Sequence, residues 1–378
     1  MTRTVSLILV DPAGELLGRL PPFTVEVPWW QEVSDVVAAA GVDVTVLRLL
    51  HGDRPSPPGG HVTYLAMTPE RPEGLLPAGT DLAPHPLRAA YAEPAGAAAS
   101  LAWAAGALDR IGLSGTIARQ QRTWNLSAIW RFDRPDGQPV AWLKQVPPFF
   151  AHEAAVCRLV DAVFPGLAPY VLAAGDEGRA LLTHVPGADQ YDAAPEFRRR
   201  VLTAFHPVQE HFAGRVDELR AAGVPELSLE TIVKVAEPHL AGIAGLGELL
   251  DGLPRRLADV DACGLPDTLV HGDLHMGNVV SDGESLTIVD WGDSVIGNAA
   301  YDVLRLPGDP GLLAGWAQLW PGREALRAAE LLRPVESLRQ AVVYAGFLES
   351  IEPSEWPYHA GDVERCLRAA VERAGGHS

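Results

Sequence analysis

The sequence predicts an α+β protein of 378 residues, with strands concentrated in its first half and helices in its second. Short apolar runs bounded by Gly, Pro and Asp turns recur up to about residue 187, which is typical of strands. Beyond residue 195, apolar residues mostly recur with helical spacing. Among these helical stretches, residues 271–278 (HGDLHMGN) and 288–293 (IVDWGD) bring together three carboxylates, one amide and two imidazoles.

The composition limits the classes of function. A length of 378 residues favours two or three domains. The formal net charge of −18 argues against a nucleic-acid partner, because such a field repels phosphate backbones. No apolar run approaches the roughly 20 residues that cross a bilayer, and no signal peptide is recognisable. We therefore expect a cytoplasmic protein with no membrane partner. Three widely spaced cysteines without a CxxC pair predict neither disulfides nor a zinc site.

Residues 1–95 are predicted to form a small α+β cap domain. Residues 5–10 form an apolar run that ends in an Asp-Pro-Ala-Gly turn, which is a hairpin signal. Helical spacing follows over residues 29–40, and strands are expected at residues 42–50 and 61–67.

The opening of this cap, residues 5–20 (VSLILVDPAGELLGRL), is similar to the first strands of Nudix-type hydrolase domains. The Nudix metal helix needs several glutamates, whereas residues 29–41 offer only Glu32 and Asp35 as acids. We therefore expect a structural or regulatory cap without pyrophosphatase chemistry. An active Nudix hydrolase is the alternative.

A Pro-rich linker at residues 77–86 leads into the second predicted domain, residues 96–187. Two strands are expected around the Pro-Asp-Gly turn at residues 135–137, and the second of them carries Lys144 among apolar neighbours. Glu153 falls in the first turn of a predicted helix, where the helix dipole favours a carboxylate. Glu153 is therefore either a helix-start residue or the partner of Lys144. The other elements expected here are a helix at 87–111, strands at 124–132 and 138–146, a helix at 151–164 and a strand at 180–185.

The third predicted domain, residues 188–378, is mostly helical and contains the polar loops. Carboxylate and amide oxygens on loops suit Mg²⁺, which takes oxygen ligands from one or two carboxylates and from phosphates. The helices are expected at 195–212, 217–222, 229–239, 243–260 and in much of the chain after residue 301.

The order of these features resembles the aminoglycoside phosphotransferase family of small-molecule kinases, which includes choline kinase-like enzymes and is related to protein kinases. The resemblance covers about residues 100–378, and residues 271–278 and 288–293 carry its most specific part. It implies a bilobal protein-kinase-like fold in which a β-rich N-lobe (96–187) precedes a helical C-lobe (188–378), with the cap in front. No long activation segment follows Asp290, so no protein substrate is expected.

The resemblance also implies roles for residues around the polar loops. Asp273 matches the catalytic base, and Asn278 and Asp290 match the ligands of Mg²⁺. Asp302 matches an aspartate that supports the catalytic loop by accepting backbone N–H groups. We expect a structural role for His271 and a core position for Trp291.

ATP is the implied co-substrate. Lys144 matches the lysine that contacts the α- and β-phosphates, and Glu153 the glutamate that holds it. There is no GxGxxG motif, so polar groups near Ser127 would cover the phosphates. The adenine edge should bind backbone groups between Thr183 and Val185.

The acceptor is predicted to be a small molecule with a hydroxyl group, most simply an amino sugar or aminoglycoside. Its amine would pair with acids of residues 350–362, where Glu352, Glu355 and His359 gather, or with Asp293 and His275 beside the catalytic loop. A solvated acidic loop explains residues 350–362 equally well. A kinase of a neutral sugar or another metabolite, and a non-catalytic nucleotide-binding regulatory protein, are the alternatives.

Overall fold

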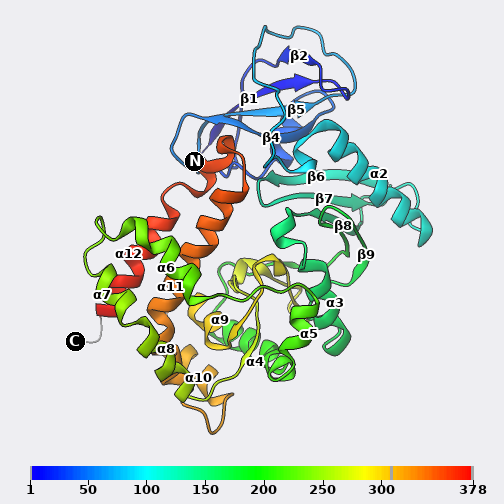
Figure 1. The fold of residues 1–378 in the computed structure, drawn as a ribbon. Coiled ribbons are helices and arrows are strands. Elements are labelled where there is room, and N and C mark those ends of the chain that lie inside the picture. The colour runs from blue at the N-terminus through cyan, green and yellow to red at the C-terminus, as the bar shows by residue number, and fades with distance from the viewer. Residues whose placement is uncertain (1, 307–309, 376–378) are drawn as a thin grey trace. The chain divides into compact units, whose positions relative to one another are not determined.

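The computed structural model describes residues 2–306 and 310–375. It divides into two compact units. Unit 1 comprises Met1–Ala151, Val171–His184 and Phe347–Ala360, and unit 2 comprises His152–Tyr170, Val185–Gly346 and Gly361–Ser378. The predicted α+β class is confirmed, since the two larger sheets belong to unit 1 and most helices to unit 2 (Figure 1). The finer division at residues 95 and 187 stays a prediction.

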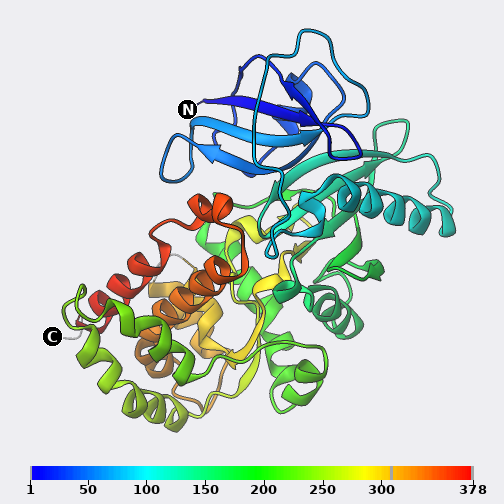
Figure 2. The same ribbon diagram turned by 45° about the horizontal axis from the view of Figure 1, so that its top comes forward.

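The first sheet of unit 1 is built by residues 3–67, drawn in blue in Figure 2, and has the strand order β2-β1-β5-β4, with β3 also pairing β1. Strands β1 and β5 are neighbours and run parallel, although β2, β3, α1 and β4 lie between them in the sequence. The predicted strands are present, whereas the predicted helix at 29–40 is reduced to α1. The elements are β1 (Arg3–Val10), β2 (Leu16–Arg19), β3 (Phe23–Val25), α1 (Ser34–Ala39), β4 (Thr45–Gly52) and β5 (Gly60–Met67).

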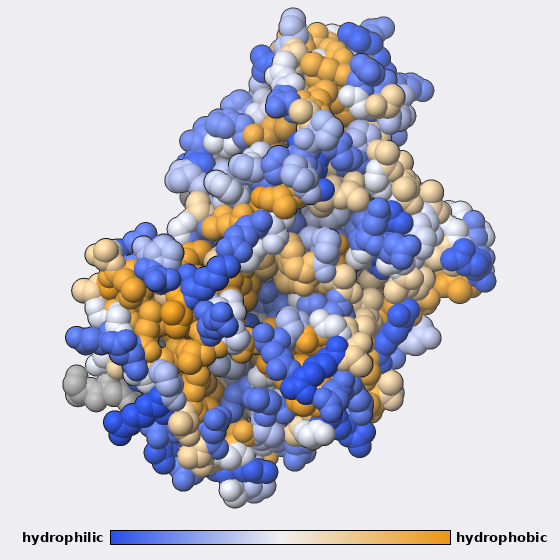
Figure 3. All heavy atoms as spheres, viewed as in Figure 1, coloured by the Kyte–Doolittle hydropathy of each residue, from blue (hydrophilic) through white to orange (hydrophobic). Residues whose placement is uncertain are grey.

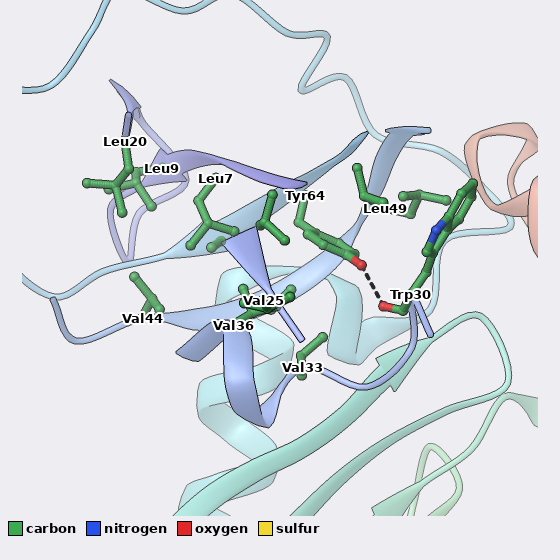
Figure 4. Packing of buried hydrophobic residues seen from close by; sticks show 14 of the residues in the cluster. Leu7, Leu9, Leu20, Val25, Trp30, Val33, Val36, Val44, Leu49 and Tyr64 are labelled. Atoms are coloured by element: carbon green, nitrogen blue, oxygen red, sulfur yellow. Dashed lines mark hydrogen bonds between the residues drawn. The ribbon is translucent and has the colours of Figure 1, made fainter. Parts of the chain in front are cut away.

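One face of this sheet packs on α1 through a continuous apolar core (Figure 4). Trp30, the largest side chain in it, is fully buried, and its backbone carbonyl accepts a hydrogen bond of 2.6 Å from the Tyr64 hydroxyl. Tyr358, from a distant part of the sequence, belongs to the same core and lies edge-on to Trp30 with ring centroids 6.0 Å apart. The core of the cap is therefore completed by the C-terminal part of unit 1.

The second sheet of unit 1 has the order β6-β7-β8-β10-β9, and all four pairings are antiparallel. The Pro-Asp-Gly turn joins β7 to β8 as predicted. Two strands, β6 and β9, were not predicted. The elements are α2 (Pro94–Arg110), β6 (Ile117–Trp124), β7 (Ser127–Asp133), β8 (Pro139–Gln145), β9 (Val171–Gly175) and β10 (Arg179–Thr183).

Side chains join the two sheets of unit 1. The Gln120 side chain on β6 accepts from Val46 N (2.9 Å) and donates to Val46 O (2.7 Å) on β4, so it acts as a substitute strand partner. In the short helix η6 (Pro353–His359), the Glu355 carboxylate accepts from Leu49 N at 2.8 Å. The same segment reaches the turn between β6 and β7, where His359 Nε2 lies 3.0 Å from the Asn125 side-chain oxygen.

Unit 2 consists of helices around two small sheets. In one sheet β12 pairs antiparallel with β15. In the other sheet β13 lies in the centre and pairs antiparallel with β11 and with β14. The strands are β11 (Ala188–Asp189), β12 (Asp267–Val270), β13 (Val279–Ser281), β14 (Leu286–Ile288) and β15 (Val295–Asn298). The helices are α3 (Glu153–Val163), α4 (Pro195–Phe212), α5 (Val216–Ala221), α6 (Leu229–Ala236), α7 (Leu246–Asp251), α8 (Leu253–Ala262), α9 (Ala300–Arg305), α10 (Pro310–Gln318), α11 (Ala325–Ser350) and α12 (Asp362–Gly375).

The surface mixes hydrophilic and apolar residues. Hydrophilic residues are spread over the whole face seen in Figure 3, with apolar residues between them. Within residues 2–306 and 310–375, no helix has the length and apolar character needed to cross a membrane.

Candidate active site

The catalytic loop of unit 2 starts where β12 ends. Asp302 on α9 lies beneath it, and its carboxylate accepts from His271 N and Gly272 N, each at 3.1 Å. Gly272 has φ +83°, and a Cβ there would stand 2.0 Å from Asp293 O, so only glycine fits. Burial raises the pKa of Asp302 to about 7, although these two N–H groups oppose the shift. The predicted supporting role of Asp302 is confirmed by these contacts.

Asp273 follows on this loop with a half-buried side chain. Burial alone would raise its pKa, but the hydrogen bond from His275 and the charge of Arg305 outweigh this and lower the pKa to about 2. Arg305 Nη2 donates to Asp273 Oδ1, and His275 Nε2 lies 3.5 Å from Oδ2. Asp273 is therefore ionised at neutral pH and is fixed by groups on both of its oxygens.

The loop is tied to the turn that carries Asp290. Asn278 Nδ2 donates to Asp273 O at 3.0 Å, while Val289 N donates to Asn278 O at 2.9 Å. Asp290 has φ 65° and ψ 61°, a left-handed conformation that few residues other than glycine adopt. Such conformations cost free energy and concentrate at functional sites.

Two further residues hold this turn. Trp291 is fully buried, as predicted, and its backbone N–H donates to Glu153 Oε1 on α3 at 3.2 Å. His271 Nε2 lies 3.0 Å from Val289 O, which agrees with the structural role predicted for this imidazole. Burial lowers the pKa of His271 to about 4, so the ring is neutral.

The acids of the two loops interact electrostatically. Burial raises the pKa of Asp293 to about 7, and the negative charges of Asp273 and Asp290 add to the shift. Such mutual repulsion is relieved by a cation, so the donor set fits Mg²⁺. Among residues 2–306 and 310–375, no group of three or more His, Cys, Asp or Glu side chains is arranged to hold a metal ion. A site made of Asn278, Asp290 and nucleotide phosphates needs no such group.

The residues predicted to bind ATP are distributed over both units. Lys144 is the penultimate residue of β8, opposite Ile129 of β7 and Ala180 of β10, with 9% of the residue exposed. Ser127 begins β7, and its hydroxyl accepts from Trp124 Nε1 at 3.1 Å. Thr183 ends β10 in unit 1, whereas Val185 and Glu153 belong to unit 2. The predicted pairing of Lys144 with Glu153 stays a prediction.

The acids predicted to bind an amine are engaged within unit 1. Arg88 donates to both oxygens of Glu352 at 3.0–3.2 Å, and Leu49 N donates to Glu355. His359 is buried against Asn125, and burial lowers its pKa to about 4. The structure thus assigns these three side chains to the internal contacts of unit 1. Asp293 and His275 do lie beside Asp273 in unit 2.

Sequence reasoning missed three residues that support the catalytic loop. Arg305 contacts Asp273, while Arg339 on α11 donates from Nη2 to Gly272 O at 2.5 Å. Glu336, one helical turn before Arg339, binds Arg339 Nε at 2.8 Å. No spacing pattern links these helix residues to the loop. The only available signal was the presence of Arg and Glu on the helices that follow it.

The comparisons with known proteins concern the family and the fold of the chain. Residues 142–329 match the model of the phosphotransferase enzyme family. None of the curated proteins matches the chain significantly.

Solved structures share the fold at low sequence identity. An ethanolamine kinase from Plasmodium vivax is 12% identical, with a TM-score of 0.54 over 72% of this chain and 87% of that one. A choline kinase from Cryptosporidium parvum is 11% identical, with a TM-score of 0.51 over 71% and 91%. The GDP and kanamycin complex of an APH(2″) enzyme is 13% identical, with a TM-score of 0.51 over 74% and 100%. The predicted kinase-like fold is confirmed, and the family match over residues 142–329 identifies this chain as a small-molecule kinase of the phosphotransferase enzyme family.

Proposed function

We propose that this kinase transfers the γ-phosphoryl group of ATP to a hydroxyl group of a small molecule, with Asp273 as the catalytic base. The observation that carries the proposal is the fixed position of Asp273. Asp302 holds the backbone just before it, and the Asn278 side chain holds its carbonyl oxygen. Phosphoryl transfer depends mainly on positioning and on electrostatic stabilisation, so a rigidly held carboxylate suits this role.

In the proposed step, the acceptor oxygen attacks the γ-phosphorus while the bond from that phosphorus to the β,γ-bridging oxygen breaks. ADP leaves with the electron pair of the broken bond. The hydroxyl proton passes to a carboxylate oxygen of Asp273 and then to solvent. The pKa of Asp273, about 2, favours orientation of the hydroxyl as its main task, with proton transfer late in the step.

Asn278 and Asp290 would hold Mg²⁺, which supplies positive charge to the β- and γ-phosphates when it is bound. Lys144 is proposed to contact the α- and β-phosphates, with Glu153 holding it. The hydrogen bond from Trp291 N to Glu153 supports the idea that Glu153 connects to the metal turn. Ser127 would cover the phosphates, and the backbone at Thr183 and Val185 would bind the adenine edge.

The acceptor predicted from sequence is an amino sugar or aminoglycoside, with a neutral sugar as the alternative. Asp293 and His275 lie beside Asp273 and would face such an acceptor. Glu352 is paired with Arg88, and one carboxylate oxygen of Glu355 accepts from Leu49 N, so both acids already have partners within unit 1.

The test is ADP release from ATP and Mg²⁺ across a panel of amino sugars, aminoglycosides and neutral, acidic and phosphorylated sugars. We expect acceptor-dependent ADP release that falls by about 10²–10⁴-fold in Asp273→Ala, since this is the usual contribution of a general base. Turnover unaffected by this substitution would overturn the assigned mechanism. Nucleotide binding without any acceptor-dependent turnover would favour the alternative of a non-catalytic regulatory protein.

A further inference from the structure

A cavity of about 300 Å³ in unit 2 lies between α9, α11 and α12, which Figure 1 labels. A volume of this order suits a molecule the size of a monosaccharide or smaller. The cavity is lined mainly by polar side chains, although the chain as a whole is strongly acidic. Three of them are arginines. The polar side chains that carry the argument are Arg305, Glu336, Gln340, Tyr344, Arg365 and Arg373.

Arg305 connects this cavity to the catalytic aspartate. Its Nη2 donates to Asp273 Oδ1, while its buried Nε makes no hydrogen bond and lies 4.0 Å from Glu336 Oε1. The guanidinium is thus shared between the base and the cavity. A guanidinium has five N–H donors in a planar fork, so Arg305 has the capacity to bind a second oxyanion.

The acids near the cavity are already paired with basic or amide groups. Glu336 binds Arg339 Nε at 2.8 Å and Gln340 Nε2 at 3.1 Å, and Asp362 binds Arg365 Nη1 at 2.6 Å. Arg373 Nη1 donates to the Ser337 hydroxyl at 2.8 Å. In the described part of the chain no ion pair joins Arg373 to a carboxylate. Arg305 and Arg365 are paired with Asp273 and Asp362, so among the described residues the positive charge that the acids of the cavity leave unneutralised is that of Arg373.

From this arrangement we infer that the acceptor carries an oxyanion, a carboxylate or a phosphate ester, which Arg365, Arg373 and Arg305 bind while its hydroxyl group faces Asp273. The inference rests on the proposed function, because it concerns the acceptor of the same phosphoryl transfer. Bound there, the oxyanion shares the Arg305 guanidinium with Asp273 and is thereby held beside the catalytic base, so Arg305 becomes a specificity-determining residue.

Four matched acceptors test the charge preference: D-glucose, D-glucosamine, D-glucuronate and D-glucose 6-phosphate. They share one ring and differ in carrying no charge, an ammonium, a carboxylate or a phosphate. With the full-length kinase, ATP and Mg²⁺, we expect ADP release to be fastest with one of the two anionic sugars. The comparison of glucuronate with glucose 6-phosphate then identifies which oxyanion is preferred.

Variants assign this preference to the cavity. The double variant Arg365→Gln/Arg373→Gln should raise KM for the anionic acceptor about tenfold, since it removes two charged hydrogen-bond donors whose exposure to water weakens each contact. The KM for ATP should not change. Arg368→Gln is the matched control, because Arg368 lies on the same helix and binds Glu364 but does not line the cavity.

The outcomes separate this inference from the proposed function. ADP release that is fastest with glucose or glucosamine, or that is unaffected by the double variant, would overturn the anionic acceptor and leave the kinase assignment intact. Absence of acceptor-dependent ADP release with all four sugars and with the wider panel would overturn the proposed function itself, and this inference with it.

Discussion

Glu355 shows how a single buried carboxyl group couples stability to pH. Burial raises its pKa from 4.5 to about 8, and the hydrogen bond from Leu49 N only partly opposes the shift. One carboxylate oxygen, Oε2, has no hydrogen-bond partner. The groups that face it include Glu352 and Arg48. The folded protein therefore keeps the Glu355 proton at a pH where the unfolded chain has released it.

The consequence is a loss of stability as pH rises. Because the folded pKa is the higher one, the stabilisation is complete below about pH 4.5 and is lost between that pH and about pH 8. Glu355→Gln keeps an oxygen for Leu49 N but has no proton to release. We expect its free energy of unfolding to gain on wild type by on the order of 1 kcal/mol per pH unit in this window. Urea denaturation near pH 5, 7 and 9 measures this, and parallel curves for the two proteins would contradict it.

At the scale of elements, β6 explains how the cap is attached to the second sheet of unit 1. Its sequence, IARQQRTW, is too polar to be recognised as a strand, so periodicity alone misses it. The strand exists because β7 pairs with one edge, while the cap contacts it from another side through Gln120 and Thr123. The partners in the cap, Val46 and Leu47, lie 74 and 76 residues away in the sequence, and local pattern carries no information about them.

Gln120 provides a direct test of this attachment. In Gln120→Ala, Val46 N and Val46 O lose their side-chain partner within the protein interior, and each unsatisfied group costs about 1–3 kcal/mol. We expect a drop of at least about 2 kcal/mol in the free energy of unfolding, measured by chemical denaturation.

The neighbouring Gln121→Ala is the control, because the Gln121 amide contacts only backbone carbonyls of its own strand. It should change the free energy of unfolding by less than about 0.5 kcal/mol, as is usual away from buried contacts. Equal losses in the two variants would indicate that the sheets are joined mainly by backbone and apolar contacts instead.

The site shows the same division between what sequence does and does not predict. The loop residues Asp273, Asn278, Asp290 and Asp302 are recognisable because a short, ordered motif fixes their spacing. Arg305, Glu336 and Arg339 act through tertiary contacts to that loop, so no spacing rule applies to them.

The observed helix boundaries differ from the expected ones for local reasons. α2 begins at Pro94, a residue suited to the first helical turn, and the expected start at residue 87 falls in irregular structure.

For the whole molecule, neither compact unit is one continuous stretch of the sequence. The chain passes between the two units at residues 151/152, 170/171, 184/185, 346/347 and 360/361. Unit 1 therefore takes its residues from three separate segments of the sequence. The cap, which looks like a domain in sequence, depends on two of these segments. Its core includes Tyr358 and packs against Trp124, and its strand β4 binds Glu355 and Gln120.

This dependence predicts the behaviour of an isolated cap. A fragment of residues 1–95 would lack Trp124 and Tyr358, whose rings are 5.6 Å apart and cover the end of the cap core. It would also leave part of β4 without hydrogen-bond partners, which favours association through the exposed edge. We expect the fragment to be aggregated or to unfold without a cooperative transition, as measured by circular dichroism and size-exclusion chromatography against the full-length chain. A monomeric fragment with a sharp thermal transition would instead establish residues 1–95 as an autonomous domain, and would make the contacts to Tyr358, Glu355 and Gln120 a docking surface rather than part of its core.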